Sequence, residues 1–184
     1  CKSFKKCQVL ARLCSKMTKL AVSPALFENW PKSKHTEMLQ MWPQLNTLVL
    51  APFSQECRNR SFQLQPEVLD SLPSLRRLHL CYVSIPILQS TIDRLEQITL
   101  YLACMRDEEL RRLASLKFSC DVRLYLVDAS VTRNLQLLLN NDNPIRRNVS
   151  FIWVEYNTIQ YFPSFRTIAD YFPHLTWLQI RITQ

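Results

Sequence analysis

The sequence predicts an α/β solenoid in which about seven short parallel strands form a concave sheet and helices cover the convex side. Two observations predict it: one apolar phrase recurs along the chain, and segments with helical periodicity separate its copies. One strand and one helix cannot bury their apolar faces alone, so adjacent units must stack and share a continuous core. The 184 residues are enough for one such core, and we expect a single domain over residues 1–184.

The recurring phrase is L-x-x-L-x-L, and its clearest copy is "LPSLRRLHL" at residues 72–80. Seven copies or near copies follow one another close to the period of leucine-rich repeats, roughly 20–29 residues. Their central apolar residues are Leu20, Leu48, Leu78, Ile98, Leu124, Phe151 and Leu178. Each copy predicts a strand, near 20–22, 48–50, 78–80, 98–100, 124–126, 151–153 and 178–180. The inward residues expected to form a buried column are Leu50, Leu80, Leu100, Leu126 and Trp153.

Helices are expected between these strands. Residues 1–16 predict a basic N-terminal helix, and residues 17–184 hold the repeats. The segments with helical apolar spacing are 35–42, 65–72, 107–116, 131–141 and 163–172. Pro43, Pro73 and Pro173 each follow one of them, and proline ends a helix and favours an extended chain at the next strand.

Composition excludes several classes of function. Glycine is absent, which rules out the glycine-rich loops that cradle nucleotides. No apolar run is long enough for a membrane span, so no membrane association is expected. The first 34 residues contain eight lysines and arginines but only one acidic residue, Glu28, whereas the rest of the chain is close to neutral. The predicted basic patch consists of Lys2, Lys5, Lys6, Arg12, Lys16 and Lys19.

Neither an enzyme, a metal site nor a cofactor is expected. The three histidines lie in different units, and His79 with Cys81 lacks the third group that would orient a nucleophile pair. Asp107, Glu108 and Glu109 are the acidic start of a helix rather than an acid–base pair. The cysteines are odd in number and lack C-x-x-C spacing, so we expect free thiols in a reducing compartment, the cytoplasm or nucleus.

The repeats resemble the irregular leucine-rich repeats of F-box/leucine-rich-repeat proteins, the substrate receptors of cullin–RING ubiquitin ligases. The P-x-L-x-x-L-x-L phrases at 43–50, 73–80 and 173–180 carry the resemblance, which covers about residues 7–182. It implies a leucine-rich-repeat horseshoe that binds a protein substrate. No F-box segment is visible, so the SCF adaptor and cullin are expected partners only if an F-box lies upstream of Cys1. The alternative is a scaffold or adaptor of another kind, associated with RNA or chromatin through the basic N-terminal end.

The expected partner-binding surface is the C-terminal half of the concave face. In L-x-x-L-x-L the leucines point into the core, so the residues between and after them face outward on the sheet. Tyrosine, tryptophan and arginine, which are enriched in binding hot spots, gather in the later units. The predicted partner-binding residues are Tyr101, Arg123, Tyr125, Ile152, Trp177 and Arg181.

Overall fold

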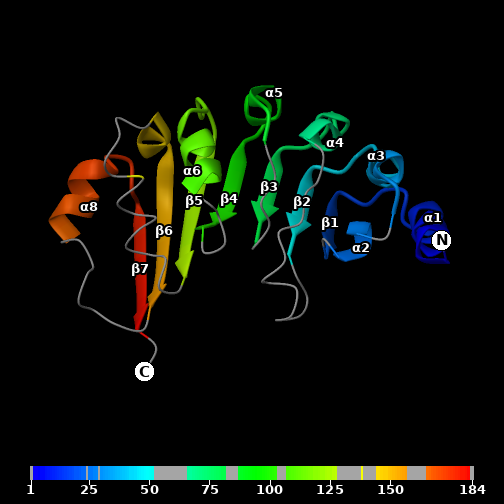
Figure 1. The fold of residues 1–184 in the computed structure, drawn as a ribbon, viewed down its shortest axis with the longest axis horizontal. Coiled ribbons are helices and arrows are strands. Elements are labelled where there is room, and N and C mark those ends of the chain that lie inside the picture. Colours follow the sequence, from blue (N-terminus) through cyan, green and yellow to red (C-terminus); the bar gives the residue numbers. More distant parts are fainter. Residues whose placement is uncertain are drawn as a thin grey trace.

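A computed structural model describes residues 2–23, 25–28, 30–51, 66–81, 87–102, 107–127, 138, 144–156 and 165–182. These residues form a seven-stranded sheet in which all strands are parallel and follow one another in chain order (Figure 1). The strands are β1 (Lys19–Val22), β2 (Thr47–Leu50), β3 (Arg77–Leu80), β4 (Gln97–Tyr101), β5 (Asp121–Val127), β6 (Val149–Tyr156) and β7 (Trp177–Ile182).

Helix α1 (Lys2–Leu13) precedes the first strand, and further helices lie between consecutive strands of the sheet. These are α2 (Ala25–Glu28), α3 (Lys32–Gln40), α4 (Pro66–Asp70), α5 (Gln89–Ile92), α6 (Asp107–Ala114) and α8 (Phe165–Tyr171), with a 3-10 turn η3 (Pro144–Arg147) before β6. Figure 1 shows α3, α4, α5 and α6 beside the ends where strands β2 to β5 begin, α1 beyond β1, and α8 at the opposite end of the sheet. The structure is therefore an α/β fold of successive strand–helix units.

The strands predicted from the sequence are all present, and their arrangement in one parallel sheet is confirmed. The helices predicted at 65–72, 107–116 and 163–172 are confirmed with shorter bounds, and the one predicted at 35–42 is confirmed but begins and ends earlier, at Lys32–Gln40. The helix predicted at 131–141 lies outside the described residues except for position 138, which is helical. Helices α2 and α5 were not predicted, because each is only 4 residues long and too short to show a helical period.

The core lies on the face of the sheet that carries the leucines. Leu50, Leu80 and Leu100 are neighbours in register across β2, β3 and β4, and all three are fully buried. Helix residues such as Leu69 and Ile168 belong to the same buried cluster. The expected column is confirmed for Leu50, Leu80 and Leu100. Leu126 is buried but belongs to another row, because Leu100 pairs with Leu124. Trp153 was wrongly placed in the column, since it lies on the opposite face and is only partly buried.

The chain enters successive strands through the same backbone pattern. The carbonyl oxygens of Thr18, Asn46 and Arg76 each accept two consecutive N–H groups from the start of the next unit. Before β2, β3 and β7 the N–H of the first leucine donates to a residue three positions earlier, Trp42, Leu72 or Phe172. Because a side-chain phrase and a backbone pattern recur together, the units are structural repeats and not merely similar sequences.

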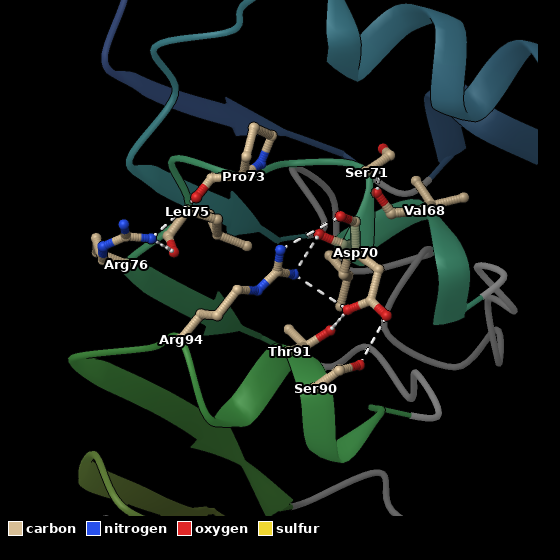
Figure 2. Close-up of polar contacts among 10 residues, drawn as sticks. Val68, Asp70, Ser71, Pro73, Leu75, Arg76, Ser90, Thr91 and Arg94 are labelled. Atoms are coloured by element: carbon tan, nitrogen blue, oxygen red, sulfur yellow. Dashed lines mark hydrogen bonds and ion pairs between the residues drawn. The ribbon is translucent and has the colours of Figure 1, made fainter.

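A polar contact joins neighbouring units on the helix side (Figure 2). Asp70, the last residue of α4, accepts hydrogen bonds from Ser90 and Thr91 of α5 and pairs with Arg94, with 3.1 Å between Nη2 and Oδ1. The guanidinium of Arg94 also reaches the carbonyl oxygens of Leu69 and Asp70, where the dipole of a helix end favours a cation. Although burial acts to raise the pKa of Asp70, the two hydroxyl hydrogen bonds and the positive charge of Arg94 lower it overall.

Candidate interaction face

The opposite surface of the sheet, here called the open face, carries the side chains that alternate with the core residues. Exposure alternates with burial along β1, β3 and β5, as expected for strands with one face toward a core. The N-terminal part of this face is small or polar. The described open-face residues are Lys19, Ala21, Thr47, Val49, Arg77, His79, Gln97, Thr99, Tyr101, Asp121, Arg123, Tyr125, Val127, Phe151, Trp153, Glu155, Trp177, Gln179 and Arg181.

Four rings form an aromatic cluster on β4, β5 and β6: Tyr101, Tyr125, Phe151 and Trp153. Tyr125 is its centre, because it stacks on Tyr101 with ring centroids 4.3 Å apart and planes 11° apart. Its ring also lies 5.3 Å from that of Phe151 and 6.0 Å from that of Trp153. Since three separate strands supply these rings, the cluster depends on the register of the whole C-terminal half of the sheet.

Arg123 is held at the edge of the aromatic cluster. Its guanidinium lies 5.8 Å from the ring centroid of Phe151, within the range of a cation–π contact. Its Nε donates to Asp121 at 3.2 Å. Asp121 also accepts hydrogen bonds from Gln97 and Ser150. Burial alone would raise the pKa of Asp121, but these two donors and Arg123 outweigh it and lower the pKa overall.

Two further predicted binding residues extend the face beyond the aromatic cluster. Trp177 on β7 is in register with Phe151, and 58% of its surface is exposed. Arg181 is exposed and lies 3.9 Å from Glu155 of the adjacent strand. The structure therefore brings Tyr101, Arg123 and Tyr125 together and places these two residues beside them, as the sequence predicted.

Ile152 was wrongly predicted for this face. It is fully buried in the core, because β6 carries one extra residue: Val122 pairs with Val149 and the adjacent Arg123 pairs with Phe151, which leaves Ser150 without a register partner. A one-residue shift moves every following side chain to the other face of a strand. Phe151, Trp153 and Glu155 therefore occupy the open face instead. Val149, Ile152 and Val154 themselves fit L-x-x-L-x-L, which is the signal in the sequence that identifies the correct face.

His79 and Cys81 lie on β3 and just after it, and neither is activated for nucleophilic chemistry. Burial raises the pKa of the Cys81 thiol to about 11, an effect that a hydrogen bond with Tyr101 only partly offsets. Burial also lowers the pKa of His79, and the positive charges of Lys19, Arg123 and Arg77 lower it further. Near neutral pH both groups are therefore mainly uncharged, whereas a reactive cysteine needs a thiolate.

The predicted basic patch divides into two places. Lys5, Lys6 and Arg12 are exposed on α1, and Lys16 is exposed just after it. Lys19 instead lies on the open face, where its charge acts on His79. The side chain of Lys2 lies outside the described residues.

Within the described ranges, no group of three or more His, Cys, Asp or Glu side chains is placed to hold a metal ion. The cysteines found there, Cys7, Cys14, Cys81 and Cys120, are free thiols, and the prediction for the other three cysteines lies outside these ranges. None of the helices in the same ranges has both the length and the apolar character needed to cross a membrane.

Comparison with known proteins adds no relative to this structural picture. No protein-family model matches the sequence, and no curated protein matches it at a significant level.

Proposed function

We propose that this chain is a leucine-rich-repeat module that binds a protein partner through the C-terminal half of its open face. We further propose that it serves as the substrate-recognition part of an SCF-type ubiquitin ligase receptor inside the cell. The recurring L-x-x-L-x-L phrase and the recurring backbone pattern at the strand starts support the leucine-rich-repeat assignment. The ligase assignment rests on the resemblance to F-box/leucine-rich-repeat proteins.

The observation that carries the binding proposal is the aromatic cluster with its charged neighbours. Tyrosine, tryptophan and arginine are the residues most enriched in binding hot spots, and large rigid rings lose little entropy on binding. Here Tyr125 and Trp153 are prearranged by ring stacking, and Arg123 is fixed between a carboxylate and a ring. Such a surface is already organised before a partner arrives, which lowers the entropic cost of association.

A protein fits this surface better than a nucleic acid does. The carboxylates of Asp121 and Glu155 lie among its cations and would repel phosphates. Tyr101 and Tyr125 stack on each other, so a base cannot intercalate between them without separating the pair. No group on this face is activated for covalent chemistry, and we propose a binding role without catalysis.

The test is partner capture by variants of the open face. Tagged parent protein and the variant Trp177→Ala are used to purify partners from cells that express the chain, and each recovered protein is quantified by mass spectrometry. Because Trp177 is mainly exposed, its loss should leave the fold intact while weakening a direct partner by about 2 kcal/mol or more. The double variant Tyr125→Ala/Trp177→Ala should lose that partner completely, with circular dichroism showing that it still folds.

The matched control is Ala21→Ser, an exposed position at the other end of the same face. It should retain the partner at the parent level. A partner recovered equally with parent and double variant would contradict binding at the aromatic cluster. Recovery of the SCF adaptor and cullin with the full-length protein would support the ligase assignment, and their absence would contradict it without affecting the binding test.

The alternative function is a leucine-rich-repeat adaptor of another kind, associated with RNA or chromatin through the basic N-terminal end. The exposed Lys5, Lys6 and Arg12 favour it. Under this alternative, nucleic acid should bind the purified chain with a strong salt dependence, and charge reversal at these three residues should abolish binding.

A further inference from the structure

Helix α1 covers one end of the sheet, and its outward side combines apolar and basic residues. Val9 is 55% exposed, Leu10 45% and Leu13 78%. Val9 and Leu13 are one helical turn apart and form an exposed apolar stripe. Lys5 and Arg12 lie along one side of this stripe and Lys6 along the other, by the same helical geometry. We call this surface the α1 outer face.

The opposite side of α1 is fixed in the core. Phe4 packs edge-on against Trp30 with ring centroids 5.2 Å apart, and Lys34 of α3 lies over the Phe4 ring. Ala11, two turns further along, is only 6% exposed. The helix therefore cannot turn its apolar stripe toward this core without losing these contacts.

The described core does not use the apolar stripe on α1. Three large apolar side chains, Val9, Leu10 and Leu13, are exposed on this side, while Phe4 and Ala11 already supply the contact with the core. Exposed apolar side chains that gather on one face, with charged residues around them, are typical of an interaction site. The stripe is therefore available to a binding partner.

The charge around the stripe indicates the chemistry of what binds there. Helix α1 contains no acidic residue, and the first acid in the chain is Glu28. A second copy of this chain would bring like charges together, which disfavours self-association through this face. A nucleic acid would meet the cations but would leave the central Val9–Leu13 stripe against charged phosphates. A membrane would require deeper insertion than a narrow stripe on a half-buried helix permits.

We propose that the α1 outer face binds an acidic amphipathic helix of a partner protein. An apolar seam on that helix would cover Val9 and Leu13, and glutamate or aspartate beside the seam would pair with Lys5, Lys6 and Arg12. This is the arrangement by which two helices pair, with an apolar stripe flanked by opposite charges. The site is separate from the aromatic cluster, so the chain has two interfaces on different elements.

The test uses a synthetic fluorescent peptide of about three heptads, with leucine forming one stripe and glutamate flanking it. Binding to the folded chain is followed by fluorescence anisotropy at two salt concentrations. The variants are Val9→Ser/Leu13→Ser and Lys5→Glu/Arg12→Glu, and the matched control is Arg111→Glu/Arg112→Glu, two exposed arginines on α6. Because all the replaced α1 residues are exposed, the variants are expected to fold, which circular dichroism verifies.

The parent and the α6 control should bind the peptide, and each α1 variant should bind at least about tenfold more weakly. A peptide with lysine in place of glutamate should bind Lys5→Glu/Arg12→Glu better than it binds the parent. No binding by the folded parent, or equal binding by the α1 variants, would overturn the proposal. It would also be overturned if the parent ignored the peptide but bound phosphatidylserine vesicles or an RNA duplex. Trp177→Ala should leave peptide binding unchanged, so this result does not depend on the open-face proposal.

Discussion

Replacing Leu100 by alanine tests the common core of the stacked units. Leu100 is fully buried on β4, and it pairs in register with Leu80 on one side and Leu124 on the other. The substitution removes the contact that links three consecutive strands. In a stack where each unit contacts mainly its neighbours, this position couples the N-terminal and C-terminal halves of the sheet.

The expected loss of stability follows from burial. Removing three buried carbons costs about 2.4 kcal/mol at about 0.8 kcal/mol per methylene group. If the surroundings do not collapse into the space left behind, the cavity adds up to about 2 kcal/mol. The free energy of unfolding should therefore fall by about 2–5 kcal/mol.

Urea denaturation followed by circular dichroism measures this loss, and Leu178→Ala is the matched control. Leu178 occupies the same register on β7 but is only partly buried, so the same substitution there should cost clearly less. A cost below about 1 kcal/mol for Leu100→Ala would show that Leu100 is not in a packed core. An equal cost for both variants would show that the burial difference between the two strands is wrong.

Two further predictions concern titratable groups on the open face and at the end of α1. The pKa of His79 is lowered below its ordinary 6.5 by burial and by Lys19, Arg123 and Arg77, so the unfolded chain takes up its proton first as the pH falls. The free energy of unfolding, measured in urea, should therefore decrease from about pH 7 to about pH 5, and His79→Gln should make this decrease smaller. An equal decrease in the parent and the variant would contradict the burial of His79 beside these cations. The second prediction concerns the thiols. Iodoacetamide at about pH 8 should modify the exposed Cys14 at least about tenfold faster than Cys81, because the pKa of about 11 keeps Cys81 protonated. Peptide mass mapping should show that the two rates converge in urea, and equal rates in the native protein would contradict the burial of Cys81.

The strands could be predicted because apolar and polar residues alternate along them and because the phrase recurs. In β3, the sequence "RLHL" allows only one choice of buried face, because Leu78 and Leu80 are apolar and Arg77 and His79 are polar. The register between β4 and β5 is shifted by two residues from the predicted one, pairing Leu100 with Leu124. A two-residue shift leaves every side chain on its original face, so Arg123 and Tyr125 were still assigned correctly.

In β6 the alternation does not identify the face, because both sets of side chains are apolar. "VSFIWVEY" offers Phe151 and Trp153 as the larger pair and Ile152 and Val154 as the smaller pair, and the larger apolar area of the first pair would gain more from burial. The choice between them depends on where the extra residue sits. The extra residue is Ser150, whose hydroxyl donates a hydrogen bond to Asp121 of the adjacent strand. Only the longer phrase, with Val149, Ile152 and Val154 in its apolar positions, points to the correct face.

The same carboxylate connects this irregularity to the binding surface. Asp121 accepts the hydroxyl of Ser150, at the extra residue of β6, and it also holds the guanidinium of Arg123. The extra residue turns Phe151 toward the open face, where its ring meets both Tyr125 and that guanidinium. Without it, the smaller aliphatic set would face outward, and the large rings would be in the core. A single bulge, fixed by a charged side chain on the adjacent strand, thus determines both the composition of the aromatic cluster and the placement of the arginine beside it.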